Sequence, residues 1–267
     1  IKRGIIPIYV FDGKPPDIKN KILESRKYIR LRALEKLANA KTKSERIKYF
    51  KRCVQITQKQ IHQARELLEL MGIPYIVASE EADSQCAYLS KNGFVDGVLT
   101  EDLDILTFGS KLIVKNLTSH KNKPVKISLN KILDILGFTY KQFVEFCVLL
   151  GCDYCNGLTD VKPNILYYYY KKHLNLPDTL KDIKCNNFNV YDIEYQKAID
   201  YFLSNETFKI IKKIDIQIKK PQINKLTYLL LNKYNLNKHK LKKKINLLKK
   251  NYQKSFEIMN KMIEINL

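Results

Sequence analysis

Apolar and charged stretches alternate along the first 150 residues of the chain. Short apolar runs, rich in β-branched residues, predict strands at residues 5–11, 74–78, 95–100 and 111–115. Residues 17–70 contain no Gly or Pro and are highly charged, which favours helices. Residues 81–92 predict another helix, with Ser79 as its N-cap and acidic residues in its first turn. Strands that alternate with helices indicate an α/β fold with a parallel sheet.

Helices dominate the pattern from residue 129 onwards. Residues 129–136 and 140–150 predict two helices that each end at a glycine. Further helices are predicted at residues 164–172, 196–203, 225–234, 238–251 and 252–265. Residues 176–195 are expected to form a loop-rich connection. We therefore expect two domains, a core over residues 1–150 and a basic helical region over residues 151–267.

The charge of the chain points to a class of partner. The 267 residues include 48 Lys+Arg and 27 Asp+Glu, a net charge of +21. Residues 201–267 alone hold 16 Lys and 4 acidic residues, a net of +12. This charge favours an acidic partner, nucleic acid first, although AT-rich codon usage is another source of lysine. With 45% hydrophobic residues the chain is not a disordered polycation, and its apolar runs are too short to span a membrane.

The six cysteines match neither a zinc-ribbon nor a disulfide-framework spacing. This usage favours a reducing, intracellular compartment. Cys152 and Cys155 form a lone C-x-x-C pair, and metal or redox use of this pair is an alternative to a purely structural role.

Acidic residues follow the predicted strands at their carboxyl ends. They are Asp12, Glu80, Glu81, Asp83, Glu101, Asp102 and Asp104, and Asp153 follows a predicted helix. Because sites in open parallel sheets form outside the carboxyl ends of the strands, we expect these side chains to converge.

Converging carboxylates raise one another's pKa values unless cations neutralise them. Oxygen ligands favour Mg²⁺, with Mn²⁺ as a substitute. Two such ions, about 3.5–4 Å apart, clamp the attacking and leaving oxygens of a phosphodiester. In a basic chain this combination predicts a nuclease. Two alternatives stay open: helix caps and solvated loop charges, or a pocket for one regulatory Mg²⁺.

Several segments, in order, resemble the flap endonuclease branch of the structure-specific 5′ nucleases. They are residues 6–16 (IPIYVFDGKPP), 67–75 (LLELMGIPY), 81–83 (EAD), 100–110 (TEDLDILTFGS) and 149–155 (LLGCDYC). The likeness covers residues 1 to about 172. It implies an α/β, parallel-sheet (PIN-like) nuclease core with a helical arch at about residues 20–60, followed by a helical DNA-binding region of the helix-two-turn-helix type.

The resemblance also implies roles for individual residues. The acidic residues match two groups of metal ligands in the family, Asp12, Glu81 and Asp83 in one group and Asp102, Asp104 and Asp153 in the other. Lys19 and Arg26 match a catalytic basic pair at the base of the arch, which stabilises negative charge in the transition state. Arg30, Lys115 and Lys162 are expected to contact the DNA backbone.

The chain departs from the family's pattern in several places. It begins at Ile1, and we expect a preceding segment that carries a first strand and a further ligand Asp. Residues 160–164 replace a glycine-containing turn that approaches a phosphate and a K⁺ ion. Residues 167–170 are four consecutive tyrosines, which either stack on bases or lie half in the core. A sliding clamp is a possible partner in the family, but no clamp-binding box is found.

The sequence therefore predicts a structure-specific 5′ flap endonuclease and 5′–3′ exonuclease that uses two Mg²⁺ ions in DNA replication or repair. The expected partner is branched or flapped DNA, with no membrane contact, and the expected state is a monomer. We expect a nuclear protein in a eukaryote, or one acting at the replication site of a large DNA virus. The alternative is a non-catalytic or fragmentary DNA-binding homologue, and we expect the 267-residue chain alone to be weakly active or inactive.

Overall fold

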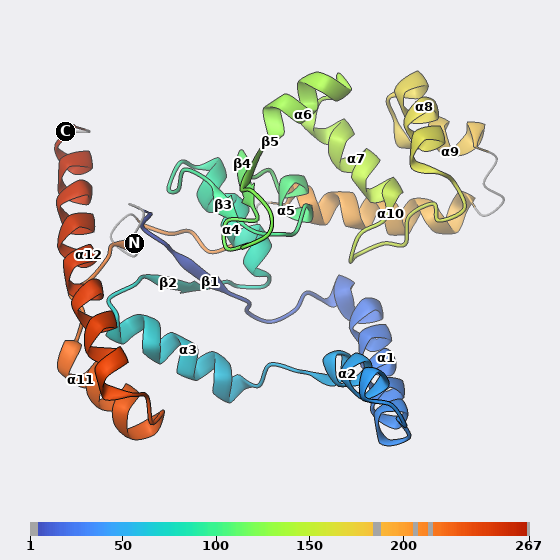
Figure 1. Ribbon diagram of the computed structural model, residues 1–267. Coiled ribbons are helices and arrows are strands. Elements are labelled where there is room, and N and C mark those ends of the chain that lie inside the picture. Colours follow the sequence, from blue (N-terminus) through green and yellow to red (C-terminus); the bar gives the residue numbers. More distant parts are fainter. Residues whose placement is uncertain (1–4, 184–187, 205–207, 213–215, 266–267) are drawn as a thin grey trace. The chain divides into compact units, whose positions relative to one another are not determined.

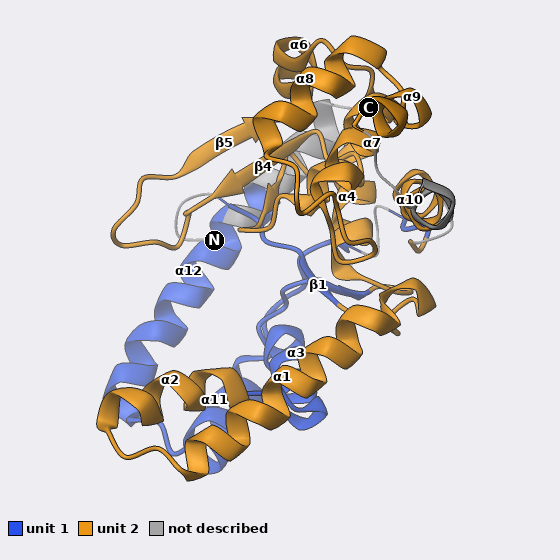
Figure 2. Ribbon diagram, turned by 90° about the vertical axis from the view of Figure 1, so that its right-hand side faces the viewer, with its two compact units in different colours: residues 1–11, 54–77, 210–267 blue, residues 12–53, 78–209 orange. Residues whose placement is uncertain are grey.

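The computed structural model describes residues 5–183, 188–204, 208–212 and 216–265 (Figure 1). The chain divides into two compact units, each built from segments that are distant in the sequence (Figure 2). Unit 1 comprises residues 1–11, 54–77 and 210–267, and unit 2 comprises residues 12–53 and 78–209. No helix among the described residues is long and apolar enough to cross a membrane.

Unit 1 pairs a small parallel sheet with three helical segments. Strand β1 (Tyr9–Phe11) lies parallel to β2 (Tyr75–Val77), with Tyr9 opposite Tyr75. The helices are α3 (Gln58–Leu70), α11 (Ile223–Tyr228) with its π-helical continuation η3 (Leu229–Lys233), and α12 (Lys238–Ile265).

The core of unit 1 forms where α11 and α12 meet the end of α3. Leu226, Leu241 and Ile245 are buried there and pack against Leu67 and Leu70 of α3. The backbone of residue 72, a glycine with φ +71°, comes so close to the carbonyl of Lys219 that no side chain fits between them. Leu67 and Leu70 of α3 are therefore partly buried by residues from the last sixty positions of the chain.

Unit 2 begins with the helix pair α1 (Asn20–Ala38) and α2 (Lys43–Cys53), after a 3₁₀ turn η1 (Asp17–Lys19). Its sheet has the order β3 (Val98–Leu99), β4 (Leu112–Lys115), β5 (Val125–Ser128), with β3 parallel and β5 antiparallel to β4. The remaining helices are α4 (Ala82–Lys91), α5 (Asp104–Thr107), α6 (Leu129–Leu136), α7 (Tyr140–Leu150), α8 (Pro163–His173), α9 (Leu176–Asp182) and α10 (Phe188–Leu203).

One large apolar core joins the sheet of unit 2 to helices α4–α10. Ile113 of β4, Val144 of α7 and Leu166 of α8 have no exposed surface and belong to this core. Tyr170, the last of the four tyrosines, is also fully buried, whereas Tyr168 is 67% exposed. The tyrosine run therefore lies half in the core, as one of the two sequence interpretations expected. The domain boundary expected near residue 150 stays a prediction.

The predicted elements are confirmed over most of the chain, with three differences. The structure adds the antiparallel strand β5 to the parallel pairs. Residues 238–265 form one helix instead of two. The expectation of a loop-rich connection at residues 176–195 is wrong, because α9 and the first half of α10 lie there.

The error at α9 has a physical cause. Asn175 caps this helix by accepting a hydrogen bond from the Asp178 amide at 2.9 Å, and Pro177 stands in its first turn. Asn and Pro two positions apart are typical of loops as well as of helix starts, and a helix of seven residues offers little periodicity to separate the two. Of the six cysteines, Cys185 lies outside the described residues.

Candidate active site

Asp12 follows β1 and lies against the start of α4. The amide of Gly13 donates to the carbonyl of Glu80 at 2.6 Å, and a side chain on Gly13 would overlap the carbonyl oxygens of Ala78 and Ser79. This close approach lets Asp12 Oδ1 accept a hydrogen bond from the amide of Ala82 at 2.9 Å. The N-cap position of α4 is Glu81, so the prediction of Ser79 as N-cap is wrong: a carboxylate 70 residues away in sequence satisfies the helix amide.

Glu81 and Asp83 stand at the N-terminus of α4, where the helix dipole favours negative charge. The two carboxylate oxygens of Glu81 accept from different donors, the ammonium of Lys19 and the hydroxyl of Tyr154. Burial and the charge of Glu81 raise the pKa of Tyr154 far above its usual value of 10, so this hydroxyl stays a hydrogen-bond donor at neutral pH.

Asp102 lies between β3 and α5, and Asp104 is the first residue of α5. The hydroxyl of Thr100 accepts from the Asp102 amide at 3.0 Å, and Asp102 Oδ1 accepts from the Asp104 amide at 3.0 Å. These two bonds fold the segment back on itself and satisfy the first amide of α5. Both aspartates are thereby held at one end of a short helix.

Asp153 is presented by a tight turn after α7. The amides and carbonyls of Cys152 and Cys155 bond to each other across the turn, at 3.0 and 3.4 Å. A side chain on Gly157 would overlap the backbone at Leu150 and Gly151, so the turn closes tightly on the end of α7. The described cysteines are free, and the C-x-x-C pair forms the base of the turn that carries Asp153.

Two cations approach these acids from the start of α1. The ammonium of Lys19 lies 3.0 Å from Asp153 Oδ2 and also binds Glu81. The guanidinium of Arg26 lies 2.7 Å from Asp153 Oδ1. Burial lowers the pKa of Lys19, but the two carboxylates outweigh it and hold that pKa above 10.5. Burial works to raise the pKa of Asp153, yet the two cations hold it below its usual value.

The pKa values show that the predicted acids lie within reach of one another's charge. Burial, followed by the charges of Asp102, Glu81 and Asp12, raises the pKa of Asp83 to about 6. Burial, followed by Asp102 and Asp153, raises the pKa of Asp104 to about 6. The structure thus brings together a six-acid cluster: Asp12, Glu81, Asp83, Asp102, Asp104 and Asp153. Elements distant in the sequence supply it. Glu80 and Glu101, which were also expected to converge, instead accept hydrogen bonds from the Tyr201 hydroxyl and the Asn116 amide.

The cluster fits a divalent cation by its donor chemistry. All six side chains offer carboxylate oxygens, the ligands that Mg²⁺ and Mn²⁺ prefer, and two of them carry pKa values raised by burial and then by neighbouring negative charge. The ammonium of Lys19 already lies between two of the carboxylates. Among the residues that the structure describes, no three His, Cys, Asp or Glu side chains stand in an arrangement that encloses a metal ion.

The other predicted cations lie apart from the six-acid cluster. Arg30 is half-buried one turn beyond Arg26 on α1, Lys115 ends β4, and Lys162 is exposed at the N-cap of α8. Within the described part of the chain, none of these three forms an ion pair with an acid of the cluster. Their expected contact with DNA stays a prediction.

Two tyrosines that the sequence analysis did not single out donate hydrogen bonds to glutamates of this region. Tyr154 binds Glu81, and its ring centroid lies 4.7 Å from that of Tyr201, whose hydroxyl donates to Glu80 at 2.8 Å. The pair therefore fixes two consecutive glutamates before α4. Tyr154 stands directly after Asp153, and this position is the only signal that the sequence offers for it.

The amino-acid sequence is similar to those of several known proteins. The sequence model of the XPG I-region matches residues 72–153. Flap endonuclease 1 of Babesia bovis is 40% identical over 205 residues, which are 76% of this chain and 30% of that protein. Flap endonuclease 1 of Caenorhabditis elegans is 35% identical over 248 residues, which are 90% of this chain and 65% of that protein.

A solved structure shares the fold. The catalytic core of Rad2 in complex with DNA substrate has a TM-score of 0.68 and 25% identity, over 92% of this chain and 79% of that chain. The predicted α/β nuclease fold is confirmed by this likeness. The chain spans 30–41% of the length of the first curated relatives that it matches.

Proposed function

Because this chain belongs to the flap endonuclease branch of the structure-specific 5′ nuclease family, we propose that the protein is a DNA nuclease that hydrolyses phosphodiester bonds in flapped or branched DNA. One observation carries the proposal. Six carboxylates converge, although burial and neighbouring negative charge raise the pKa values of Asp83 and Asp104, and two cations stand in contact with the cluster. A protein that only binds DNA has no use for such a cluster, since carboxylates repel phosphates.

The six-acid cluster would hold two divalent cations, Mg²⁺ with Mn²⁺ as a substitute. Asp12, Glu81 and Asp83 would serve one group of ligands and Asp102, Asp104 and Asp153 the other, following the family resemblance. When bound, such ions supply Lewis-acid stabilisation of the phosphate and an activated water. Asp83 and Asp104 would bind the ions as carboxylates, and the bound ions would lower their raised pKa values.

Lys19 and Arg26 would bind the scissile phosphate. Asp153 forms an ion pair with each of them, one through each carboxylate oxygen, and so holds both head groups at the edge of the cluster. A planar guanidinium and an ammonium placed in advance stabilise the additional negative charge that develops on phosphate oxygens during displacement.

The remainder of unit 2 supplies a surface for the DNA backbone. Residues 20–53 hold 12 Lys+Arg and 3 acidic residues, a net charge of +9. Arg30, Lys115 and Lys162 would add contacts to backbone phosphates, which position DNA without reading its sequence. Recognition by phosphates and by shape fits a nuclease that selects a branched structure.

The role of the protein would lie in DNA replication or repair, in the nucleus of a eukaryote, with the protein acting as a monomer.

Cleavage of a labelled 5′-flap DNA tests this proposal. We expect cleavage by the protein with Mg²⁺ and none with EDTA, and we expect Asp102→Ala to abolish cleavage while binding of the same DNA stays within about threefold. Asp96→Ala, at an exposed aspartate outside the six-acid cluster, is the matched control and should cleave normally. Cleavage that persists in EDTA or in Asp102→Ala would contradict the proposed mechanism. Binding without any cleavage would favour the non-catalytic alternative.

A further inference from the structure

Helix α10 places one tyrosine hydroxyl at the start of α4. This helix packs against α7 in unit 2 (Figure 1), and the hydroxyl of its residue Tyr201 donates a hydrogen bond to Glu80 Oε2 at 2.8 Å. Burial, then the hydrogen bond to Glu80 and the charges of Glu81 and Glu80, raise the pKa of Tyr201 above its usual value of 10. The hydroxyl therefore stays a hydrogen-bond donor at neutral pH.

Aromatic neighbours hold the ring of Tyr201 in place. Its centroid lies 5.9 Å from that of Phe108 and 4.7 Å from that of Tyr154. The next residue of α10, Phe202, is 3% exposed, and its ring packs edge-on against Phe108 at 4.8 Å between centroids. The hydroxyl of Tyr201 therefore approaches Glu80 from a fixed direction.

Glu80 is the point at which two backbone segments of the candidate site meet. Its carbonyl accepts a hydrogen bond from the amide of Gly13 at 2.6 Å, directly after Asp12. The residue that follows it, Glu81, is the N-cap of α4. Asp12 Oδ1 in turn accepts from the amide of Ala82 at 2.9 Å. A restraint on Glu80 therefore acts on both Asp12 and Glu81, two proposed ligands of one metal group.

The side chain of Glu80 depends on a neutral donor. It is half-buried, and among the residues that the structure describes no cation forms an ion pair with it. A half-buried carboxylate next to other carboxylates needs a hydrogen bond to offset lost solvation and repulsion. The Tyr201 hydroxyl supplies this bond without drawing Lys19 away from the acids of the cluster. Loss of the hydroxyl would free the side chain of Glu80 and loosen the backbone on both sides of it.

We propose that Tyr201 is a positioning residue for divalent cations, which holds Glu80 and thereby preorganises Asp12 and Glu81 as ligands of one metal group. Residues that orient metal ligands by hydrogen bonds typically cost about 10–100-fold in metal affinity when they are replaced. The inference rests on the proposed function in so far as the cations are those of the six-acid cluster. Tyr201 acts through Glu80 and takes no part in the chemistry.

Binding of Mn²⁺ to the protein without DNA, followed by the electron paramagnetic resonance signal of the free ion, tests the proposal apart from cleavage. Tyr201→Phe keeps the ring and removes the hydroxyl, and we expect it to raise the dissociation constant for Mn²⁺ about tenfold. Tyr170→Phe is the matched control, because the Tyr170 hydroxyl donates to Glu145 at 2.7 Å in the same apolar core. It should bind Mn²⁺ as the parent does, and equal losses in these two variants would overturn the proposal.

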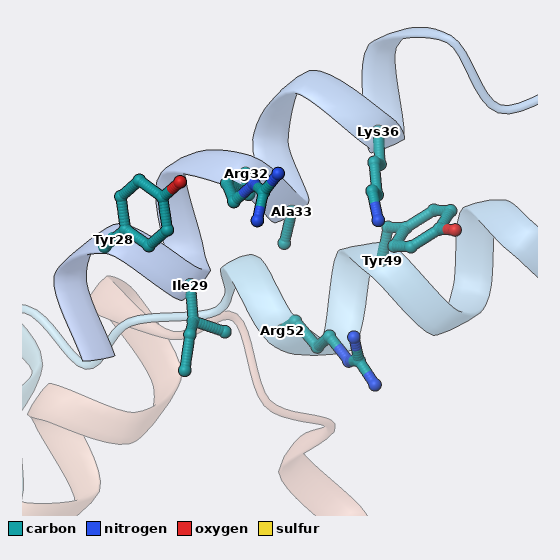
Figure 3. A pocket seen from close by; sticks show the side chains of 7 residues that line it. All are labelled: Tyr28, Ile29, Arg32, Ala33, Lys36, Tyr49 and Arg52. Atoms are coloured by element: carbon teal, nitrogen blue, oxygen red, sulfur yellow. The ribbon is translucent and has the colours of Figure 1, made fainter. Parts of the chain in front are cut away.

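A second control is a tyrosine of the α1–α2 pair. Tyr28 is 59% exposed and lines a cavity of about 190 Å³ between these helices, beside Arg32 (Figure 3). None of the residues that line this cavity is acidic. Tyr28→Phe should therefore leave Mn²⁺ binding unchanged, and a loss as large as that of Tyr201→Phe would contradict a specific role for Tyr201.

Removal of the acceptor tests the route through Glu80. In a Glu80→Ala background, Tyr201→Phe should have no further effect on the dissociation constant, because the partner of the hydroxyl is absent. In a Glu80→Gln background the acceptor oxygen is kept without its charge, and Tyr201→Phe should still weaken Mn²⁺ binding. A full tenfold loss in the Glu80→Ala background would overturn this route.

Cleavage of flap DNA at several Mg²⁺ concentrations separates positioning from a general loss of structure. The rate of Tyr201→Phe should lie about tenfold below the parent's at limiting Mg²⁺ and within about threefold of it at saturating Mg²⁺. An undiminished loss at saturating Mg²⁺ would contradict a role in cation binding.

The outcomes also separate this inference from the proposed function. Mn²⁺ binding that depends on Tyr201, together with absence of cleavage by the parent, would reject the nuclease proposal and keep the positioning role. Normal cleavage by the parent with unchanged Mn²⁺ binding in Tyr201→Phe would do the reverse. A parent that binds no Mn²⁺ would overturn both.

Discussion

The six-acid cluster and the α1–α2 pair carry opposite charges in the same unit, and the structure holds them in opposite ways. Backbone hydrogen bonds, tight glycine contacts and two ion-paired cations fix the acids, and the side chain of Glu81 is only 12% exposed. On the helix pair most cations are exposed to solvent. A buried charge needs a partner and a fixed frame, whereas exposed cations are solvated and stay available to a ligand.

The largest expected difference between these regions lies in catalysis. On the proposed function, Arg26→Ala should lower the rate of flap cleavage by about 10²–10³-fold, the cost of removing one preorganised charge from a transition state. Lys27→Ala removes the adjacent, exposed cation of α1 and should change the rate by less than about threefold. Single-turnover cleavage assays measure both, and equal losses in the two variants would remove the distinction between the regions.

The tightly packed backbone beside the cluster should tolerate an added side chain less well than an open position on the surface. Gly13→Ala places a methyl group against the carbonyl oxygens of Ala78 and Ser79, and we expect it to lower the free energy of unfolding by about 1–3 kcal/mol. Gly93→Ala is the matched control, because Gly93 has φ +71° and no neighbouring atom within contact, so only the backbone conformation is penalised, by about 1 kcal/mol. Urea unfolding compares the two, and a smaller cost at Gly13 than at Gly93 would count against a tight frame.

The burial of the acids predicts a pH dependence in EDTA. Asp83 and Asp104 have pKa values of about 6 in the folded protein, above the ordinary value of 3.8, so the folded state holds more protons than the unfolded state between about pH 4 and 6. These two groups therefore lower stability as the pH rises through that window. Asp83→Asn should gain about 1–2 kcal/mol of stability over the parent at pH 7, and none at pH 3.5.

Thermal or urea unfolding at a series of pH values measures this gain. The control is Asp96→Asn, at an exposed aspartate outside the cluster, which should follow the parent at every pH within about 0.5 kcal/mol. A gain for Asp83→Asn that is independent of pH would show that ionisation of the buried Asp83 carboxyl is not its cause.

The smallest expected effects on folding belong to the helix pair. Lys43→Gln and Lys48→Gln remove exposed cations of α2, and we expect the free energy of unfolding to change by less than about 0.5 kcal/mol. If either cation contacts a phosphate, the slope of log affinity for single-stranded DNA against log salt should fall by about 0.7. Anisotropy titrations at several KCl concentrations measure the slope.

Part of the candidate site follows from sequence position. Each acid of the cluster stands after a strand or a helix whose residues predict that element, and convergence follows from the direction of parallel strands. The spacing of Lys19 and Arg26, two helical turns, likewise places both on one face. The cap that Asp12 provides to α4 was not predictable, because Ser79 is a good N-cap by residue type and only the close approach at Gly13 decides between them.

The class of fold, the limits of helices such as α6, α7 and α8, and the chemistry of the donors follow from the sequence alone. These properties depend on residue type and on periodicity over short windows, which are local. Which charges meet depends on tertiary packing. Lys19 and Glu81 are 62 residues apart and Arg26 and Asp153 are 127 apart, and their ion pairs exist because packing brings their elements together. Local sequence patterns carry no information about contacts between residues so far apart in the sequence.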